Sequence, residues 1–262
     1  MKILFKGAGD LATGIAYELW KAGAKVIMTE IAVPLTVRRM VAFSRAVYEG
    51  KCQVEEAKGC LVHNLEEALR ETETGNIAVI VDENAEIRKE YQPDVVIDAI
   101  MAKRNTGTQL SDAPLVIGIG PGFCAGKDCH YVIETQRGEH LGEIIRHGSA
   151  IPNTGIPGNV FGYTTERLLR ASADGKMRPI ANIGDVVEKG QIVAFTGDVP
   201  VHAGLTGIVR GMLQEGVMVK EGMKIGDVDV RTEKRLCFTI SDKARQIGAS
   251  VIEIFERNGL QM

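Results

Sequence analysis

The chain has no excess of basic residues and few aromatic ones. Its 262 residues include 31 Lys and Arg against 34 Asp and Glu, which gives a formal net charge of -3. Without a cationic surface, binding to nucleic acid or to an anionic membrane surface is not expected. Aromatic residues make up 5% of the chain, and this scarcity disfavours platforms that stack bases or sugars. We therefore expect neither a nucleic acid nor a membrane as a partner.

Long apolar runs and cysteine motifs are also absent. The longest apolar stretches, such as residues 77–81, have the length of a strand and fall far short of the ~20 residues of a membrane-spanning helix. The N-terminus starts with a strand-like pattern and has no signal-peptide features, which predicts a cytoplasmic protein. The five cysteines are scattered and form no Cys-x-x-Cys. This argues against a disulfide framework and a zinc ribbon, and we expect no metal site.

Glycine, by contrast, is abundant, and the first part of the chain alternates apolar runs with helical patterns. The compositions typical of buried strands occur at residues 3–5, 25–29, 60–62, 77–81, 95–100 and 115–119. Residues 11–22 and the segment after Asn64 have helical spacing, and Pro34 opens a further helical pattern that reaches Val47. Strands that alternate with helices predict a Rossmann-like, doubly wound parallel sheet.

The second part of the chain contains an internal repeat. It follows a turn-rich stretch near residue 150 and has an offset of 32 residues, from Gly175 to Gly207. Two hairpin halves with glycines at matching turns resemble a biotinyl/lipoyl-like flattened barrel, so we expect a small all-β barrel-sandwich domain. Carrier domains hold their modified lysine between the halves, and residues 195–200 contain no lysine. No biotin or lipoyl attachment is therefore expected.

Together these patterns predict an α/β protein of three parts. Residues 1–150 are expected to form a Rossmann-like nucleotide- or cofactor-binding domain, and residues 151–235 a barrel-sandwich hybrid domain. Residues 236–262 are expected to form a C-terminal strand and helix that pack back on the body, because residues 241–257 carry an apolar stripe at helical spacing.

The first candidate site is a Gly-x-Gly-x-x-Ala pattern that follows the first strand and opens a helix. Such a turn lets the backbone approach a pyrophosphate, and the N–H groups at the start of the helix bind anions. The candidate cofactor-binding residues here are Gly7, Gly9, Asp10, Leu11 and Ala12. Glu30 ends the second strand, where a carboxylate would accept hydrogen bonds from the ribose of NAD(H). A merely structural tight turn is the alternative interpretation.

A basic pair follows the strand at residues 95–100. Because ligands of a doubly wound sheet bind at the carboxyl ends of its strands, Lys103, Arg104 and Asn105 are candidate residues for an anionic ligand. Two solvated basic side chains on a loop are the simpler alternative. Asp98 lies inside the strand and must be paired if it is buried, either as a partner of these bases or as part of the site.

A second glycine turn follows the strand at residues 115–119. Gly120 and Gly122 predict another backbone cradle at the same edge of the sheet. Cys124, Cys129 and His130 come next and are candidate catalytic residues, because a basic neighbour lowers the pKa of a thiol. Small buried apolar cysteines are the simpler interpretation. The Cys-x4-Cys-His spacing is not typical of a tetrahedral metal site.

Several longer strings in the same order resemble the YqeB family, accessory proteins of selenium-dependent molybdenum hydroxylases. The matching segments are residues 6–14, 101–105, 118–126, 134–138, 152–158 and 240–245. The resemblance implies a Rossmann-type domain joined to a barrel-sandwich module, and a role in maturation of the molybdenum cofactor. Other members often carry different residues at the positions of Cys124 and Cys129, so the resemblance argues against either thiol as an obligatory selenium carrier.

The combined hypothesis is a maturation protein that binds a small anionic ligand, either a nucleotide such as NAD(H) or a molybdopterin-type cofactor. The resemblance implies a molybdenum hydroxylase client or other maturation proteins as partners. Two alternatives stay open: an NAD-dependent oxidoreductase of unknown substrate, and a non-catalytic binding scaffold. The sequence leaves open whether any reaction is catalysed and whether the chain forms a homo-oligomer.

Overall fold

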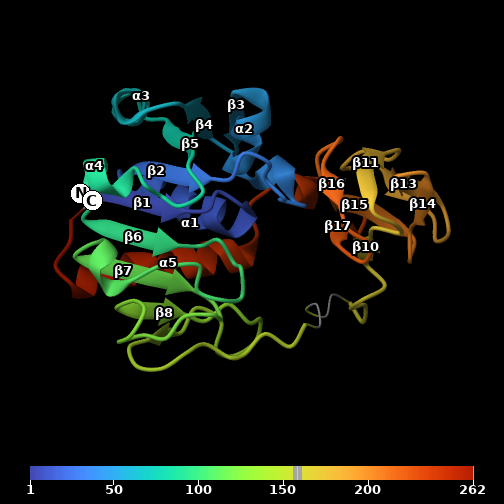
Figure 1. The fold of residues 1–262 in the computed structure, drawn as a ribbon. Coiled ribbons are helices and arrows are strands. Elements are labelled where there is room, and N and C mark those ends of the chain that lie inside the picture. Colours follow the sequence, from blue (N-terminus) through green and yellow to red (C-terminus); the bar gives the residue numbers. More distant parts are fainter. Residues whose placement is uncertain (156–157, 159–160, 262) are drawn as a thin grey trace. The chain divides into compact units, whose positions relative to one another are not determined.

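The computed structural model describes residues 1–155, 158 and 161–261. The chain divides into two compact units (Figure 1). Unit 1 comprises Met1–Pro34, Ala42–Thr154 and Ile240–Met262, and unit 2 comprises Leu35–Val41 and Gly155–Thr239. Among the described residues, no helix has the length and apolar character needed to cross a membrane.

Unit 1 is built around a nine-stranded sheet (Figure 1). Its strands are β1 (Lys2–Lys6), β2 (Lys25–Glu30), β3 (Lys51–Val54), β4 (Ala57–Val62), β5 (Ile77–Val81), β6 (Val95–Asp98), β7 (Leu115–Ile119), β8 (Tyr131–Ile133) and β9 (Ile144–Ile145). The strand order is β3-β4-β5-β2-β1-β6-β7-β8-β9. The pairs between β4 and β8 are parallel, whereas β3–β4 and β8–β9 at the two edges are antiparallel. The central strands are buried on both faces, as parallel strands usually are.

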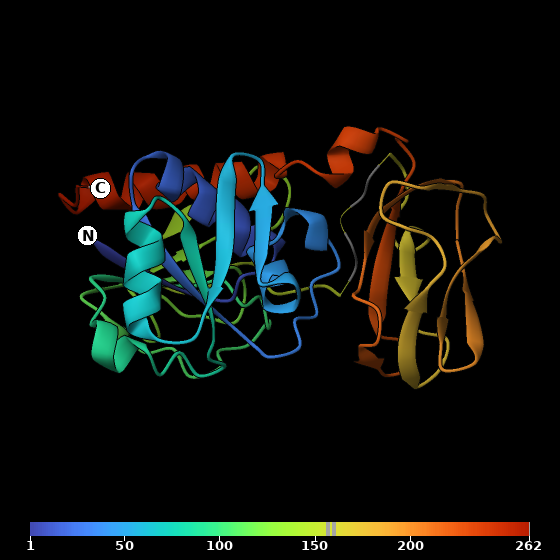
Figure 2. The ribbon, with the colours of Figure 1, turned by 90° about the horizontal axis from the view of Figure 1, so that it is seen from above.

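The two faces of this sheet are covered in different ways. The helices α1 (Asp10–Lys21) and α5 (Asp242–Arg257) pack together along one face (Figure 2). The other face packs against α3 (Leu65–Glu73), the short α4 (Arg88–Tyr91) and irregular segments that contribute Phe123 and Ala150 to the core. The remaining short helical segments are α2 (Ala46–Glu49) and 3-10 turns at Arg39–Val41, Phe43–Arg45, Leu110–Asp112 and Lys234–Cys237.

In the described part of unit 2, the strands form two four-stranded antiparallel sheets. Its strands are β10 (Leu168–Arg170), β11 (Gly175–Pro179), β12 (Val186–Val187), β13 (Ile192–Thr196), β14 (Val199–His202), β15 (Gly207–Met212), β16 (Met218–Val219) and β17 (Lys224–Asp229). The sheet orders are β10-β17-β15-β12 and β14-β13-β11-β16. The repeat places Gly175 and Gly207 at the starts of β11 and β15, and each half lends one short strand to the other half's sheet.

The expected fold class, a Rossmann-like doubly wound sheet plus a biotinyl/lipoyl-like barrel-sandwich domain, is wrong. The chain is a mixed α/β protein with a nine-stranded, mostly parallel sheet and two antiparallel sheets. A doubly wound sheet needs crossover helices on both faces, but the crossover from β6 to β7 carries only a 3-10 turn and that from β7 to β8 carries no helix. In the second part, glycine spacing marks where a chain turns but leaves open how the strands pair into sheets.

The helical pattern predicted after Pro34 is only partly right, because residues 39–49 form two 3-10 turns and the short α2 in place of one helix. Leu35–Val41 belongs to unit 2, where the backbone N–H of Met212 donates to the carbonyl of Val37 at 2.8 Å. A Cβ at Gly211 would lie 2.7 Å from the Val37 side chain, so the chain at Val37 packs directly against β15. The apolar residues up to Val41 and those after it therefore belong to two different units, and no single helix connects them.

A close contact holds α1 and α5 together. Gly14 faces Ala244 so tightly that a Cβ on the glycine would lie 2.4 Å from the Cβ of Ala244. One turn further along both helices, Gly248 faces Ile15 and Glu18. Because residue numbers rise together along the contact, the two helices run parallel and both N-termini lie at the same edge of the sheet (Figure 2). The guanidinium of Arg245 also pairs with Glu18 across the contact.

In Gly14→Ala the new methyl group overpacks the contact with Ala244, which we expect to cost about 2–3 kcal/mol and to lower the free energy of unfolding by about 1–2 kcal/mol net. This effect outweighs the gain of about 1 kcal/mol that alanine brings to a helix interior. Urea denaturation followed by circular dichroism measures the change.

Ala244→Gly introduced together with Gly14→Ala removes one clashing methyl group and should restore part of the loss. Ala249→Gly serves as the control for helix propensity, because Ala249 is exposed on the same helix. A Gly14→Ala variant at least as stable as the parent protein would contradict the close helix contact.

Candidate functional site

Three of the candidate groups come together at the carboxyl ends of the parallel strands. The turn after β1, the loop after β6 and the turn after β7 are neighbours because these strands are adjacent in the sheet. A Cβ at Gly7 would lie 3.0 Å from the Cα of Ile100, so the first turn contacts the loop after β6. A Cβ at Gly122 would lie 2.6 Å from the backbone nitrogen of Arg104, so this loop also contacts the second glycine turn.

Hydrogen bonds within the protein fix the first glycine turn. Gly7 has a φ of +91°, which favours glycine, and its N–H donates to the carbonyl of Thr29 at 2.9 Å. The carboxylate of Glu30 accepts from the N–H groups of Ala8 at 3.0 Å and Ile31 at 2.9 Å. Burial raises the pKa of Glu30, and these two hydrogen bonds oppose the rise. Glu30 therefore holds the turn in shape with both of its oxygens.

The start of α1 lies directly after this turn. Gly9 is the N-cap of the helix, and among the described residues no side chain hydrogen-bonds to the cap. The early N–H groups of a helix lack partners within the helix and attract negative charge. Residues 9–12 therefore present backbone donors at the edge of the sheet, with the Asp10 carboxylate beside them.

A buried polar network lies beneath the turn. Lys6 Nζ donates to Thr108 Oγ1 at 2.6 Å, and this hydroxyl donates to Asp98 Oδ2 at 2.6 Å. Lys6 and Asp98 also form an ion pair at 3.6 Å, and both side chains are almost completely buried. The network ties the loop after β6 to the centre of the sheet. Asp98 is thus paired with Lys6 and Thr108 inside the protein.

The loop after β6 has a strained backbone. Met101 and Lys103 have φ values of 62° and 63°, in the left-handed region that residues other than glycine rarely adopt. Asn105 closes the loop, because its Oδ1 accepts from the N–H groups of Gly107 and Thr108. Its amide is therefore used within the loop. Lys103 and Arg104 are exposed at the loop tip, and partial burial of the Lys103 ammonium lowers its pKa.

The second glycine turn is packed against protein atoms. Gly120 would place a Cβ 2.7 Å from Thr135 Oγ1, and Gly122 lies against the backbone of Lys103 and Arg104. The N–H of Gly120 donates to the carbonyl of Ile133 at 2.8 Å. In this structure the turn lets the loop after β6 approach closely.

The three catalytic candidates do not lie together at this edge. Cys129 is fully buried, and burial raises its pKa to about 12, which keeps the thiol protonated and unreactive. Cys124 is half-buried, and its Sγ lies 3.8 Å from the carbonyl oxygen of Ala125. His130 lies just before β8, at the amino ends of the strands, where its Nδ1 accepts from the N–H of Val116 at 2.9 Å.

Two cations that the sequence did not assign to the site lie at this edge: Lys243, in the first turn of α5, and Arg137, which follows β8. Burial lowers the pKa of Lys243, and the positive charges of Arg137 and Lys103 lower it further. Asp10 and Glu134 oppose the shift. Lys243 follows Asp242, the partner of Arg137, at the start of α5, and Lys103 and Asp10 follow β6 and β1 at the same edge of the sheet. The only sequence signal for Arg137 and Lys243 is that they lie in the segments 134–138 and 240–245, which carry the family resemblance.

Hydrogen bonds hold two charged residues, Arg137 and Glu134, whose charges act on Lys243. Arg137 makes a bidentate pair with Asp242, with distances of 3.0 and 2.9 Å. Glu134 is buried and accepts from the N–H groups of Thr135, Gln136 and Ile151 at 2.6–2.7 Å. The negative charge of Glu134 is therefore stabilised by backbone dipoles close to the cations.

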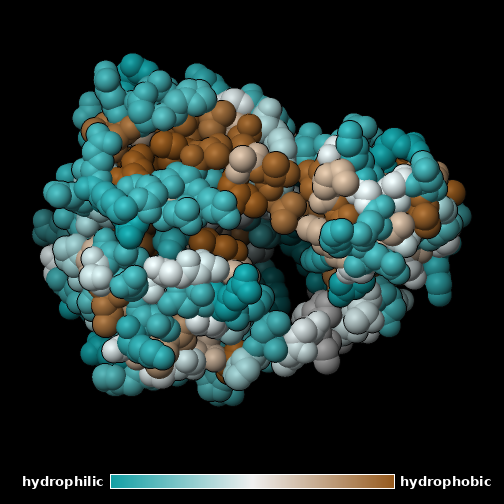
Figure 3. All heavy atoms as spheres, viewed as in Figure 1, coloured by the Kyte–Doolittle hydropathy of each residue, from teal (hydrophilic) through white to brown (hydrophobic). Residues whose placement is uncertain are grey.

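Exposed apolar side chains lie along the same edge. Val33 follows β2, Val81 ends β5 and Ile100 follows β6, and each is exposed. Figure 3 shows apolar surface among hydrophilic residues on this unit. A ligand at this edge would therefore meet apolar surface as well as cations. Among the described residues, no group of three His, Cys, Asp or Glu side chains is placed to hold a metal ion.

Comparison of the sequence with known proteins links the chain to YqeB. No family model matches it. The chain is 47% identical over 251 residues to the "Uncharacterized protein YqeB" of Escherichia coli (strain K12), and the match covers 96% of the chain. It covers 46% of the relative, so the chain spans about half the length of that protein. The chain is a relative of YqeB, which supports the family that the sequence motifs indicate.

Solved structures resemble the chain only weakly. The ectoine utilization protein EutE (DoeB) of Ruegeria pomeroyi in its product-bound form is 13% identical, with a TM-score of 0.25 over 87% of the chain and 57% of that structure. An aspartoacylase family protein from Mesorhizobium loti and a succinylglutamate desuccinylase from Silicibacter sp. TM1040 are 10% and 12% identical, with TM-scores of 0.26 and 0.27. Both matches cover 87% of the chain and 84% of the solved structure. Scores this low assign neither a fold nor an activity.

The buried network predicts the effect of removing one hydroxyl. Thr108→Val deprives Lys6 of a hydrogen-bond acceptor and Asp98 of a donor, and should lower the free energy of unfolding by about 1–3 kcal/mol. Thr106→Val is the matched control, because Thr106 is exposed on the same loop. Equal stability of the two variants in urea denaturation would show that the network does not anchor the loop.

Proposed function

We propose that this chain binds a small anionic ligand, a nucleotide or a molybdopterin-type cofactor, at the carboxyl edge of the nine-stranded sheet. In line with the family resemblance, we further propose that it serves as an accessory protein in the maturation of selenium-dependent molybdenum hydroxylases. A client hydroxylase or another maturation protein would be its partner.

One observation carries the ligand proposal: the N-termini of the parallel helices α1 and α5 lie at one edge, beside Lys103 and Lys243. Helix N-termini carry partial positive charge, and the two lysines add charges that pair with phosphate oxygens. Both lysines have lowered pKa values because they are partly buried, and Lys103 further lowers the pKa of Lys243. An anion placed between these cations would relieve their repulsion.

The neighbouring surface supports a ligand with a flat, partly apolar portion. Exposed Ile100 follows β6, the strand next to β1, and exposed Val81 ends β5, two strands from β1 on its other side. A pterin or a nucleobase can pack against such side chains while its phosphate contacts the cations. Because Glu30 is engaged by the backbone of its own turn, the proposal assigns it to the shape of the turn and not to a ribose.

Calorimetric titration tests ligand binding, with NADH, cytidine diphosphate and isolated molybdenum cofactor as probes. We expect binding of at least one probe, with an affinity about tenfold lower in Lys103→Gln and again in Lys243→Gln, because each loses a charge-assisted hydrogen bond. Lys58→Gln, an exposed lysine on β4, is the control and should bind like the parent protein. Failure of all three probes at millimolar concentration would refute the ligand proposal.

The lowered lysine pKa values predict how binding depends on pH. A lysine binds an anion as the ammonium ion, so affinity should fall as the pH rises through the lowered pKa of Lys243 and Lys103. The fall should begin below the ordinary lysine pKa of about 10.4. Titrations in two buffers of different ionisation enthalpy should also detect proton uptake on binding. Constant affinity from pH 7 up to that ordinary value would contradict a role for these lysines.

The maturation role needs a separate test in cells. Deletion of the gene should lower the activity of selenium-dependent molybdenum hydroxylases, and the parent gene should restore it. The double variant Lys103→Gln/Lys243→Gln should not restore activity if ligand binding serves maturation. Unchanged hydroxylase activity in the deletion strain would overturn this role and leave the ligand proposal standing.

A further inference from the structure

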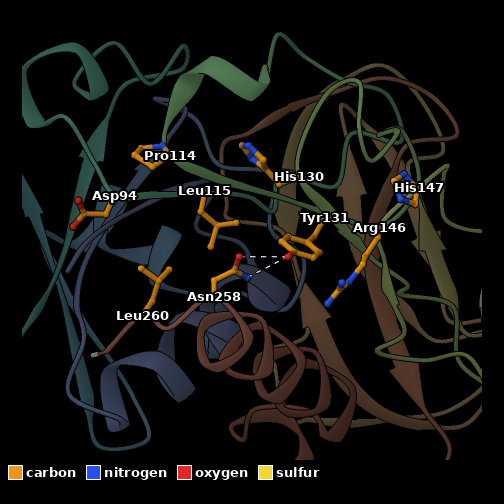
Figure 4. Close-up of a pocket in the computed structure, with 9 residues that line it drawn as sticks. All are labelled: Asp94, Pro114, Leu115, His130, Tyr131, Arg146, His147, Asn258 and Leu260. Carbon is orange, nitrogen blue, oxygen red and sulfur yellow. Dashed lines mark hydrogen bonds between the residues drawn. The ribbon is translucent and has the colours of Figure 1, made fainter.

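A hollow lies at the opposite edge of the sheet, at the amino ends of β6, β7 and β8. It has a volume of about 510 Å³, within the range of small-molecule sites. Figure 4 shows side chains from several segments converging on it, among them Leu115 at the start of β7, Tyr131 at the start of β8 and Asn258 after α5. All its lining residues belong to unit 1.

One side of this amino-edge hollow carries hydrogen-bond donors. The guanidinium of Arg146 lies over the ring of Tyr131, 5.8 Å from its centroid, and this cation–π contact orients it. His130 Nδ1 accepts from the N–H of Val116, so the neutral ring carries its hydrogen on Nε2 and offers a donor. Asn258 Nδ2 donates to the hydroxyl oxygen of Tyr131 at 3.2 Å and holds it in place.

The other side is apolar and ends at a carboxylate. Leu115 and Leu260 line the hollow next to the polar groups, and Asp94 lies beyond them (Figure 4). Asp94 Oδ2 accepts from the backbone N–H of Lys2 at 2.8 Å, which fixes its position. The hollow thus has a cationic end and an apolar middle, and a negative charge lies at its far end.

We propose that the amino-edge hollow binds a small monocarboxylate with an apolar body. The carboxylate would pair with the Arg146 guanidinium, whose planar donors match its two oxygens, and the body would cover Leu115 and Leu260. Arg146 is the one lysine or arginine among the lining residues, and Asp94 repels additional negative charge. The site therefore selects a singly charged ligand, unlike the cation cluster at the carboxyl edge.

Ligand-observed saturation-transfer NMR and calorimetry test this site with acetate, hexanoate, benzoate and benzamide. Hexanoate and benzoate should bind the parent protein. Acetate, which lacks the apolar body, and benzamide, which lacks the negative charge, should bind at least about tenfold more weakly. Absence of hexanoate and benzoate binding at about 10 mM, a concentration that detects even millimolar affinity, would overturn the proposal.

Two variants locate the binding. Arg146→Gln should weaken benzoate binding about tenfold or more through loss of the charged pair, whereas Arg70→Gln, on the exposed surface of α3, should not change it. Leu260→Ala should reduce the preference for hexanoate over acetate without changing the affinity for acetate. Benzoate binding that is unaffected by Arg146→Gln would place the ligand elsewhere and overturn the assignment. Because Lys103 and Lys243 take no part, failure here leaves the proposed function intact.

Discussion

The contact between α1 and α5 is the constraint on which the candidate site depends. These helices are more than 200 residues apart in the sequence, and only the absence of side chains at Gly14 and Gly248 lets them approach so closely. Because they run parallel, the contact sets the position of Lys243 along the axis of α1 and keeps it at the edge of Asp10 and Lys103, whose charges shift its pKa. A shift of one helical turn, about 5.4 Å, would separate these charges. The same glycines that allow close packing therefore fix the electrostatics of the carboxyl edge.

A second constraint acts on the loop after β6. Left-handed backbone at Met101 and Lys103 is unfavourable by about 1 kcal/mol or more at each residue, so other interactions must hold it. Two of them are visible: the Lys6–Thr108–Asp98 network below the loop and the close approach of Gly122 above it. The glycine-rich segments that suggest phosphate turns in the sequence thus serve largely to let protein segments approach one another. Contacts on two sides therefore hold the strained backbone from which the Lys103 side chain extends.

The sequence predicted local features better than long-range ones. The apolar runs at residues 3–5, 77–81 and 115–119 all lie in strands of the sheet, because burial on both faces demands continuous apolar residues. The absence of helices between β6, β7 and β8 could not be predicted in the same way. The loops that bury Phe123 and Ala150 have no regular spacing of apolar residues. Glu30 was correctly placed at the end of its strand, but which groups its carboxylate contacts depends on the fold of the turn. The charged groups that act on Lys243 come from separate segments of the chain, and no motif in the sequence indicates that these segments meet.

The segment from Gly120 to His130 illustrates why neighbours in sequence need not share a site. Gly120 lies at the carboxyl edge after β7, and the chain then crosses one face of the sheet, where Phe123 and Cys129 enter the core. It reaches the amino edge at His130, immediately before β8. A parallel crossover always returns the chain to the opposite edge, so a motif that spans one is divided between two edges. The glycines and the histidine of this segment consequently belong to different surfaces, one surrounded by several cations and the other by a single guanidinium and a carboxylate.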